Sequence, residues 1–309
     1  MSKTALLFAG QGAQVVGMGK DLAEKYPSAK SWFERANSVL GYDLTSICFN
    51  GPEAELTKTE NAQPGIFLVS WVAFQLLKEQ LPSLSFQATA GLSLGEFTAL
   101  AAADALSFED ALKLVRQRGR FMQEACEATR GGMAAIIGLE EAPTREVCAR
   151  AGVVLANLNC PGQLVISGEA EKISQACELA KAKGARRALP LAVAGAYHSP
   201  LMASAQPKLQ AELARANVSE PKITVVSNVT AQPYKDAESI RSRLVEQVTG
   251  SVRWEESMRH LLAEGFTRFI ELGPGTALSG FMKRIDKNAI MLNVADEASL
   301  EVTAKSLAP

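Results

Sequence analysis

The sequence is poor in the residues from which metal sites and disulfide frameworks are built. It has two histidines, and its five cysteines are scattered, with no C-x-x-C pair. Structural zinc sites take four Cys or His ligands at short spacings, so we expect no metal site. An odd number of dispersed cysteines also argues against a secreted, disulfide-bonded domain and indicates thiols kept reduced.

Long apolar runs and an excess of one charge are also missing. The longest apolar stretch, residues 65–77, is interrupted by Ser70 and Gln75 and is too short to cross a bilayer. The apolar run over residues 4–9 is too short for a secretory signal. The 32 basic and 33 acidic residues balance, which argues against a nucleic-acid partner. We therefore expect a cytoplasmic protein that binds neither nucleic acid nor membrane.

What the chain does have is apolar sequence arranged in two periods. Hydrophobic residues make up 47% of 309 positions, enough for a large core and more than one unit. Short apolar runs typical of buried strands alternate with segments of helical spacing, which predicts an α/β fold with a mainly parallel sheet. The predicted strands of this sheet cover residues 5–9, 86–90, 223–228, 267–272 and 290–294.

The middle of the chain follows a different order. From residue 131 to residue 193 the pattern reads strand, helix, strand, strand, helix, strand, which is the ferredoxin-like split unit. We interpret it as a small subdomain over residues 129–195. It would be inserted into a discontinuous large domain formed by residues 1–128 and 196–309.

One stretch has the sequence pattern of a nucleophile. Ser93 stands between Gly91 and Gly95 in G-x-S-x-G spacing, after a predicted strand and before a predicted helix over residues 94–106. Strand, sharp turn and helix form the setting in which such a serine becomes a nucleophile elbow. The alternative is a serine that only tightens the turn between the two elements.

A serine nucleophile needs a base, and histidine is the usual one. His260 falls off the apolar face formed by Trp254, Met258 and Leu261 on a predicted helix, so we expect it to be solvated. His198 lies in a loop of small residues, where catalytic groups are often found. It is the better candidate by elimination, and a purely structural loop histidine is the alternative.

Five segments in the same order resemble a known family. They read LFAGQGAQVVGMG, GLSLGEF, RQRGRFM, ANLNCPGQLVISG and GAYHSPLM, and together they extend over most of the chain. They resemble the malonyl-CoA:acyl carrier protein transacylases of fatty-acid synthesis. The resemblance implies an α/β-hydrolase-like large domain with a ferredoxin-like insert. It also implies malonyl-CoA and acyl carrier protein as partners, with the coenzyme A thioester as a substrate and no bound cofactor.

The resemblance also assigns roles to individual residues. It makes Ser93 the acylated nucleophile and His198 its base, with the backbone N–H groups of Gln11 and Leu94 in the oxyanion hole. Arg118 would hold the free carboxylate of the malonyl group. A planar, two-pronged donor of this kind suits a carboxylate better than lysine does.

Two further positions carry weaker assignments. Gln247 would orient His198 through its backbone carbonyl, which explains why no acidic third member of a triad is evident. Asn159 would lie behind the reacting groups or toward the coenzyme. We also expect a monomer, and the sequence leaves open whether the carrier protein serves fatty-acid or polyketide synthesis.

The chain departs from the family at the position before the nucleophile. Leu92 stands where the family commonly has histidine. That position is not the base, so the transferase interpretation holds. Two alternatives stay open: a serine hydrolase of the lipase or patatin kind, with water as acceptor, and a non-catalytic scaffold that binds carrier protein.

Overall fold

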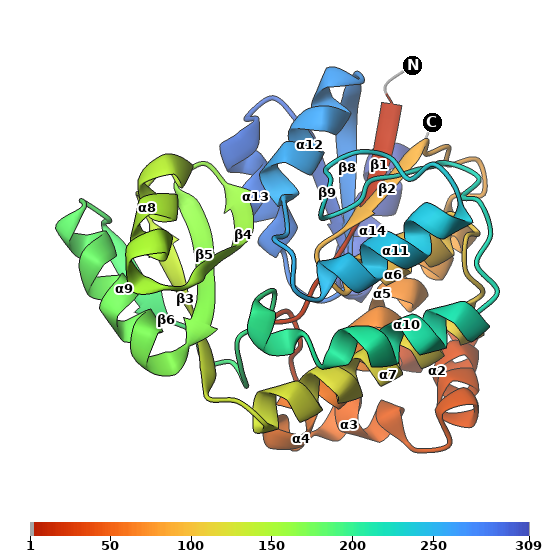
Figure 1. The fold of residues 1–309 in the computed structure, drawn as a ribbon. Helices are drawn as coiled ribbons and strands as arrows, with labels where there is room; N and C mark the ends of the chain where they lie inside the picture. The colour runs from red at the N-terminus through yellow and green to blue at the C-terminus, as the bar shows by residue number, and fades with distance from the viewer. Residues whose placement is uncertain (1–2, 309) are drawn as a thin grey trace.

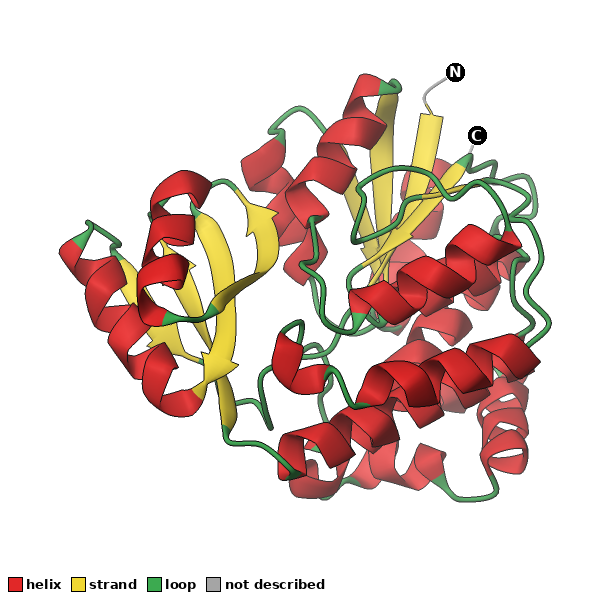
Figure 2. Ribbon diagram, in the orientation of Figure 1, coloured by secondary structure: helices red, strands yellow, loops and turns green. Residues whose placement is uncertain are grey.

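The computed structural model describes residues 3–308 and has two parts, drawn in Figures 1 and 2. The larger part is built on a sheet of five strands in the order β7-β2-β1-β8-β9, with every neighbouring pair parallel. The strands are β1 (Lys3–Phe8), β2 (Ala88–Gly91), β7 (Thr224–Val225), β8 (Phe266–Leu272) and β9 (Ile290–Val294).

The central strand β1 is apolar from Ala5 to Phe8 because both of its faces are covered there. Leu6 and Phe8 face one side and pack in the main core with the helices on that side. Ala5 and Leu7 face the other side and pack with residues of two further helices, α12 (Trp254–Ala263) and α13 (Ala277–Ile285). A strand covered on both faces has no solvent side, so apolar residues do not alternate with polar ones.

Helices form the remainder of the large part. The helix α5 (Thr59–Gln80) is buried over most of its length, because the stretch over residues 65–77 is apolar on nearly every side. The helix α7 (Phe108–Glu127) begins at Ser107, whose side chain accepts a hydrogen bond from the Asp110 N–H. The other helices are α1 (Lys20–Lys25), α2 (Pro27–Leu40), α3 (Leu44–Asn50), α4 (Glu53–Thr57), α6 (Gly95–Ala102), η1 (Pro200–Met202), α10 (Ala205–Arg215), α11 (Ala237–Gln247) and α14 (Glu297–Leu307).

The smaller part is an antiparallel sheet in the order β4-β5-β3-β6 with two helices on one face, at the left of Figure 1. It has its own hydrophobic core. The predicted α/β fold with a ferredoxin-like insert is confirmed, while the domain boundaries at residues 129 and 195 stay a prediction. Its elements are β3 (Gly131–Ile137), α8 (Glu141–Ala151), β4 (Val154–Cys160), β5 (Gln163–Glu169), α9 (Ala170–Ala182) and β6 (Arg187–Pro190).

Three details differ from the sequence prediction. The helix after Ser93 ends at Ala102, because Asp104 adopts a left-handed backbone conformation with φ 59°. The strand predicted over residues 223–228 shrinks to Thr224–Val225 at the sheet edge. The sequence from residue 201 to residue 216 predicts one helix, which the structure divides into η1 and α10.

Two expectations of absence concern the whole chain. Within residues 3–308 no helix is long and apolar enough to cross a membrane. The same part of the chain has no group of three or more His, Cys, Asp or Glu residues that could hold a metal ion. All five cysteines are buried free thiols.

Candidate active site

Ser93 lies in the turn between β2 and α6, with a left-handed backbone φ of 52°. Strained backbone of this kind is found where a side chain must be held in one direction. The turn is tight because a Cβ on Gly91 would lie 1.9 Å from the Gly95 carbonyl carbon. A Cβ on Gly95 would lie 2.3 Å from the Phe8 carbonyl oxygen. The spacing of the two glycines therefore follows from close backbone packing.

The elbow is held from outside the motif by Asn228. Its side-chain oxygen accepts a hydrogen bond from the Ser93 N–H at 2.7 Å. Its side-chain nitrogen donates to the Gly91 carbonyl oxygen at 2.8 Å. The two bonds satisfy one backbone N–H and one backbone carbonyl of the turn.

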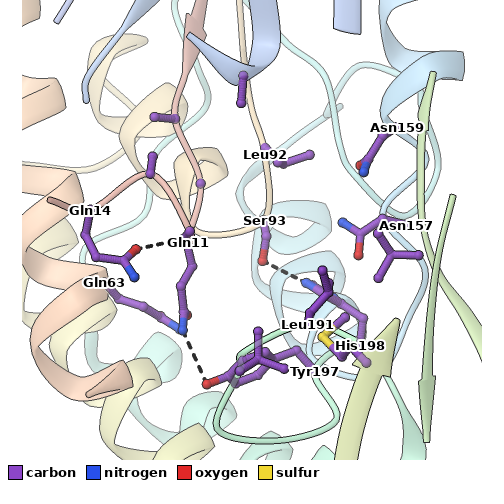
Figure 3. A pocket seen from close by; sticks show the side chains of 18 of the residues that line it. Gln11, Gln14, Gln63, Leu92, Ser93, Asn157, Asn159, Leu191, Tyr197 and His198 are labelled. Atoms are coloured by element: carbon purple, nitrogen blue, oxygen red, sulfur yellow. Dashed lines mark hydrogen bonds between the residues drawn. The ribbon is translucent and has the colours of Figure 1, made fainter. Parts of the chain in front are cut away.

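The structure brings His198 to the serine side chain. The Nε2 atom of His198 lies 2.8 Å from Ser93 Oγ, as Figure 3 shows. On the other side of the ring, Nδ1 lies 2.9 Å from the Gln247 carbonyl oxygen and 3.2 Å from that of Gly250. Carbonyl oxygens only accept, so Nδ1 carries the proton and Nε2 is the acceptor. The Ser93 hydroxyl therefore donates to His198.

The surroundings keep this imidazole neutral. His198 is 4% exposed. Burial, with the positive charge of Arg118 as a smaller cause, lowers its pKa to about 4. A neutral ring at neutral pH can take a proton from a hydroxyl. The other histidine, His260, lies on α12. We expected it to be solvated, but it is half-buried.

Arg118 comes from the middle of α7, where most arginines would be solvated. Here it is 1% exposed, and its Nη2 donates to Ser93 Oγ at 3.0 Å. The same nitrogen donates to the Gln247 side-chain oxygen at 2.9 Å, and Nη1 donates to the Gln63 side-chain oxygen at 2.7 Å. The helices α7 and α5 can approach closely because residue 119 of α7 is a glycine. A Cβ there would lie only 2.6 Å from the Thr59 carbonyl oxygen of α5.

The Arg118 guanidinium stays charged and keeps spare hydrogen-bonding capacity. Burial lowers its pKa to about 10, still well above neutral. Its Nε is buried without a hydrogen-bond acceptor among residues 3–308. The neighbouring arginines differ, since Arg116 pairs with Glu60 and Arg120 with Glu124 at the surface.

The backbone N–H groups of Gln11 and Leu94 have no hydrogen-bond acceptor in the described part of the chain. Leu94 is the N-cap residue of α6, where the helix dipole favours negative charge. The Gln11 side chain is fixed, since its nitrogen donates to the Tyr197 hydroxyl at 3.3 Å and its oxygen accepts from Gln63 at 3.2 Å. Backbone N–H groups without an acceptor are free to donate to an oxyanion.

One cavity of about 310 Å³ lies between the two parts of the molecule, and its lining includes Ser93, His198, Arg118 and Gln11. In Figure 3, Asn157 and Asn159 of β4 lie on the opposite side from Gln11 and Gln63. Asn159 is buried, and its side-chain oxygen has no partner among residues 3–308.

Leu92 forms part of an apolar wall of this cavity. It packs at the edge of the hydrophobic cluster that includes Leu278, and Phe281 packs there as well. A leucine at this position is accommodated by apolar neighbours and leaves the contact between Ser93 and His198 intact.

Sequence reasoning missed four residues of this site: Gln63, Glu96, Tyr197 and Asn228. Their contacts join segments far apart in the chain. Glu96 and Tyr197 lie in the segments GLSLGEF and GAYHSPLM, but the resemblance assigned them no role. Gln63 is one of several polar residues at the start of α5, before the apolar stretch over residues 65–77, so nothing in its local sequence singles it out.

The family model described as an acyl transferase domain matches residues 5–301. The chain is 45% identical to the malonyl CoA-acyl carrier protein transacylase of Bacillus subtilis, covering 99% of this chain and 98% of that protein. It is 41% identical to the protein of the same name from Escherichia coli, covering 92% and 93%.

Solved structures give the same result. A malonyl-transacylase in complex with a type II PKS acyl-carrier protein superposes with a TM-score of 0.95 at 38% identity, covering 99% of this chain and 100% of that one. The malonyl CoA-acyl carrier protein transacylase of Coxiella burnetii superposes with a TM-score of 0.95 at 36% identity, covering 100% and 98%.

Proposed function

The chain belongs to the acyl transferase family, and from that membership we propose that it moves the malonyl group of malonyl-CoA to the phosphopantetheine thiol of an acyl carrier protein. The proposed route is covalent and has two halves, with a malonyl ester of Ser93 between them. The thioester supplies the activated acyl group, so the route uses coenzyme A as a leaving group and no resident cofactor.

In the first half, Ser93 Oγ attacks the thioester carbonyl carbon and its proton passes to His198 Nε2. Negative charge develops on the carbonyl oxygen, which the N–H groups of Gln11 and Leu94 would stabilise. One such donor is typically worth ~3–4 kcal/mol in the transition state. The carbon–sulfur bond then breaks, and the coenzyme A sulfur leaves with the proton from His198.

In the second half, the carrier thiol gives its proton to His198 and attacks the malonyl ester. The same oxyanion forms and collapses, and Ser93 Oγ leaves with the proton held on His198. Since Nδ1 is bound to the Gln247 and Gly250 carbonyls, the positive charge formed on the ring is stabilised without a carboxylate partner.

The observation that carries the malonyl assignment is the buried Arg118 guanidinium, 3.0 Å from Ser93 Oγ. A buried cation beside a nucleophile is costly unless a partner compensates it. The free carboxylate of a malonyl group on Ser93 would be such a partner, because arginine can hold it through two parallel hydrogen bonds. A hydrolase of neutral esters has no use for this charge.

Intact-mass spectrometry tests the proposal in two additions. Malonyl-CoA should add one malonyl group to the protein, and holo acyl carrier protein should then remove it and gain the same mass. Loss of the group to water, with no transfer to the carrier, would support the hydrolase alternative. Absence of any adduct would support the scaffold alternative.

A further inference from the structure

A buried carboxylate lies directly behind the elbow, and the proposed mechanism gives it no role. Glu96 is in the first turn of α6 and is 1% exposed. No lysine, arginine or histidine among residues 3–308 forms an ion pair with it. Instead it accepts from the Tyr234 hydroxyl, from the Asn228 N–H at 3.0 Å and from the Gln247 side-chain nitrogen.

Two of these donors belong to residues that hold the reacting groups. Asn228 binds the Ser93 N–H and the Gly91 carbonyl. Gln247 makes three further contacts: its side-chain nitrogen donates to the Ser93 carbonyl oxygen at 2.9 Å, its side-chain oxygen accepts from Arg118, and its backbone oxygen accepts from His198. Ser93, His198 and Arg118 are therefore each joined to Glu96 through a single hydrogen-bonded residue.

The Gln247 amide can point only one way. An ionised carboxylate accepts only and a guanidinium donates only, so the amide nitrogen must face Glu96 and the amide oxygen must face Arg118. The amide is thus a polar link between a buried negative and a buried positive charge. If position 96 stopped being a pure acceptor, the amide would have no orientation that satisfies both neighbours.

We propose that Glu96 is a positioning residue, whose carboxylate acts through Gln247 and Asn228 to fix the Arg118 guanidinium and the Ser93 elbow. Burial is the main influence on its pKa and raises it to about 7, while its three hydrogen bonds and the charge of Arg118 oppose that rise. The amide orientation described above is therefore that of the ionised form, and protonation of Glu96 below about pH 7 should loosen it. The effect on malonyl binding rests on the proposed function, whereas the effect on the elbow does not.

Three variants separate this role from space filling. Glu96→Gln keeps the side-chain volume and replaces one acceptor oxygen with an N–H₂ donor. In either orientation of the new amide, this donor faces another donor, the Asn228 N–H or the Gln247 side-chain nitrogen. Gln247→Glu places two carboxylates face to face. The double variant Glu96→Gln/Gln247→Glu restores one donor and one acceptor at that contact, and it moves the negative charge directly onto Arg118.

Labelling by a serine-reactive fluorophosphonate measures the elbow, because this probe needs no malonyl recognition. Each single variant should label about 10-fold more slowly or worse, as expected when a buried donor or acceptor loses its partner. The double variant should label faster than either single variant, but it should not reach the wild-type rate, because a carboxylate at position 247 cannot donate to the Ser93 carbonyl oxygen. Its half-saturating malonyl-CoA concentration in acyl-enzyme formation should stay at least about 10-fold raised, because the carboxylate introduced at position 247 would compete with the substrate for Arg118.

Thermal melting and gel filtration accompany each measurement. Glu96→Gln that labels at the wild-type rate would overturn the proposal, and so would a double variant that fails to fold or folds without recovering. A wild-type protein that labels with the probe but forms no malonyl adduct would instead contradict the proposed function. The two failures are therefore distinguishable.

Discussion

Arg118→Ala asks about substrate choice rather than activity alone. A two-pronged clamp on the malonyl carboxylate consists of charged hydrogen bonds worth ~1.5–3 kcal/mol each, or ~3–6 kcal/mol together. At ~1.4 kcal/mol per decade, the loss in kcat/KM for malonyl-CoA should be about 10²–10⁴-fold. Acetyl-CoA has no carboxylate to hold, so the preference for malonyl-CoA over acetyl-CoA should collapse.

The structure adds a smaller effect that both substrates share. Arg118 also donates to Ser93 Oγ, Gln247 and Gln63, so its removal leaves two amide oxygens without a donor. We expect acetyl transfer to slow by about 10-fold or less, the cost of one imperfectly held contact. The ratio of the two substrates, rather than either rate, is therefore the quantity to measure.

The same variant should change the pH dependence. The base works as neutral imidazole, so kcat/KM for acylation falls as pH falls through the free-enzyme pKa of His198, about 4. The Arg118 charge contributes to lowering that pKa, so its removal should move the acidic limb to higher pH. Burial is the larger cause and remains in the variant, so the pKa should stay below its ordinary value.

The assay is quenched-flow acyl-enzyme formation, read by intact mass, with each substrate between about pH 4 and pH 8. Arg116→Ala is the matched control, because that neighbouring arginine pairs with Glu60 outside the cavity and should leave the substrate ratio unchanged. Equal losses for both substrates in Arg118→Ala would refute the clamp. An unmoved acidic limb would refute the electrostatic link to His198.

Three more outcomes are expected, each read by the same mass assay. Ser93→Ala should abolish the malonyl adduct with little change in Tm, and an adduct that persists would mean that the nucleophile is elsewhere. His198→Ala should slow transfer by about 10²–10⁴-fold, the usual contribution of a positioned base, while His260→Ala should transfer normally; the reverse result would overturn the assignment. Leu92→His should stay within a few-fold of wild type, and a gain of several orders of magnitude would favour the scaffold alternative.

Much of the fold could be predicted because periodicity is a local property. The strand–turn–helix around Ser93 and all six elements of the small subdomain follow from apolar spacing within about ten residues. The helix α11 escaped this reasoning because it buries few residues, mainly Ile240, Leu244 and Gln247. Its capping box of Asp236 and Ser239 was the available signal.

The site divides in the same way. Ser93 has a local motif, and His198 emerges by elimination among two histidines. Arg118 and Gln247 came from family resemblance, and their contacts with Ser93 join positions 25 and 154 residues apart. Glu96 lies in the segment GLSLGEF, but no role was assigned to it, because a buried carboxylate looks like any first-turn helix glutamate until its donors are known. Its donor Asn228, 132 residues away, lies in none of the five segments.

The strand order also has a consequence for how the chain assembles. The strands of the small sheet pair with one another between residues 131 and 190, and the small subdomain has its own core. The central strand β1 pairs with β2 and with β8, whose residues 266–272 are synthesised near the end. One of the two edges of β1 therefore pairs with a strand from near the other end of the chain. Contacts this distant in sequence form slowly. We expect pulse-labelled hydrogen exchange during refolding to show protected amides in β3 and β5 before β1, and simultaneous protection would contradict this order.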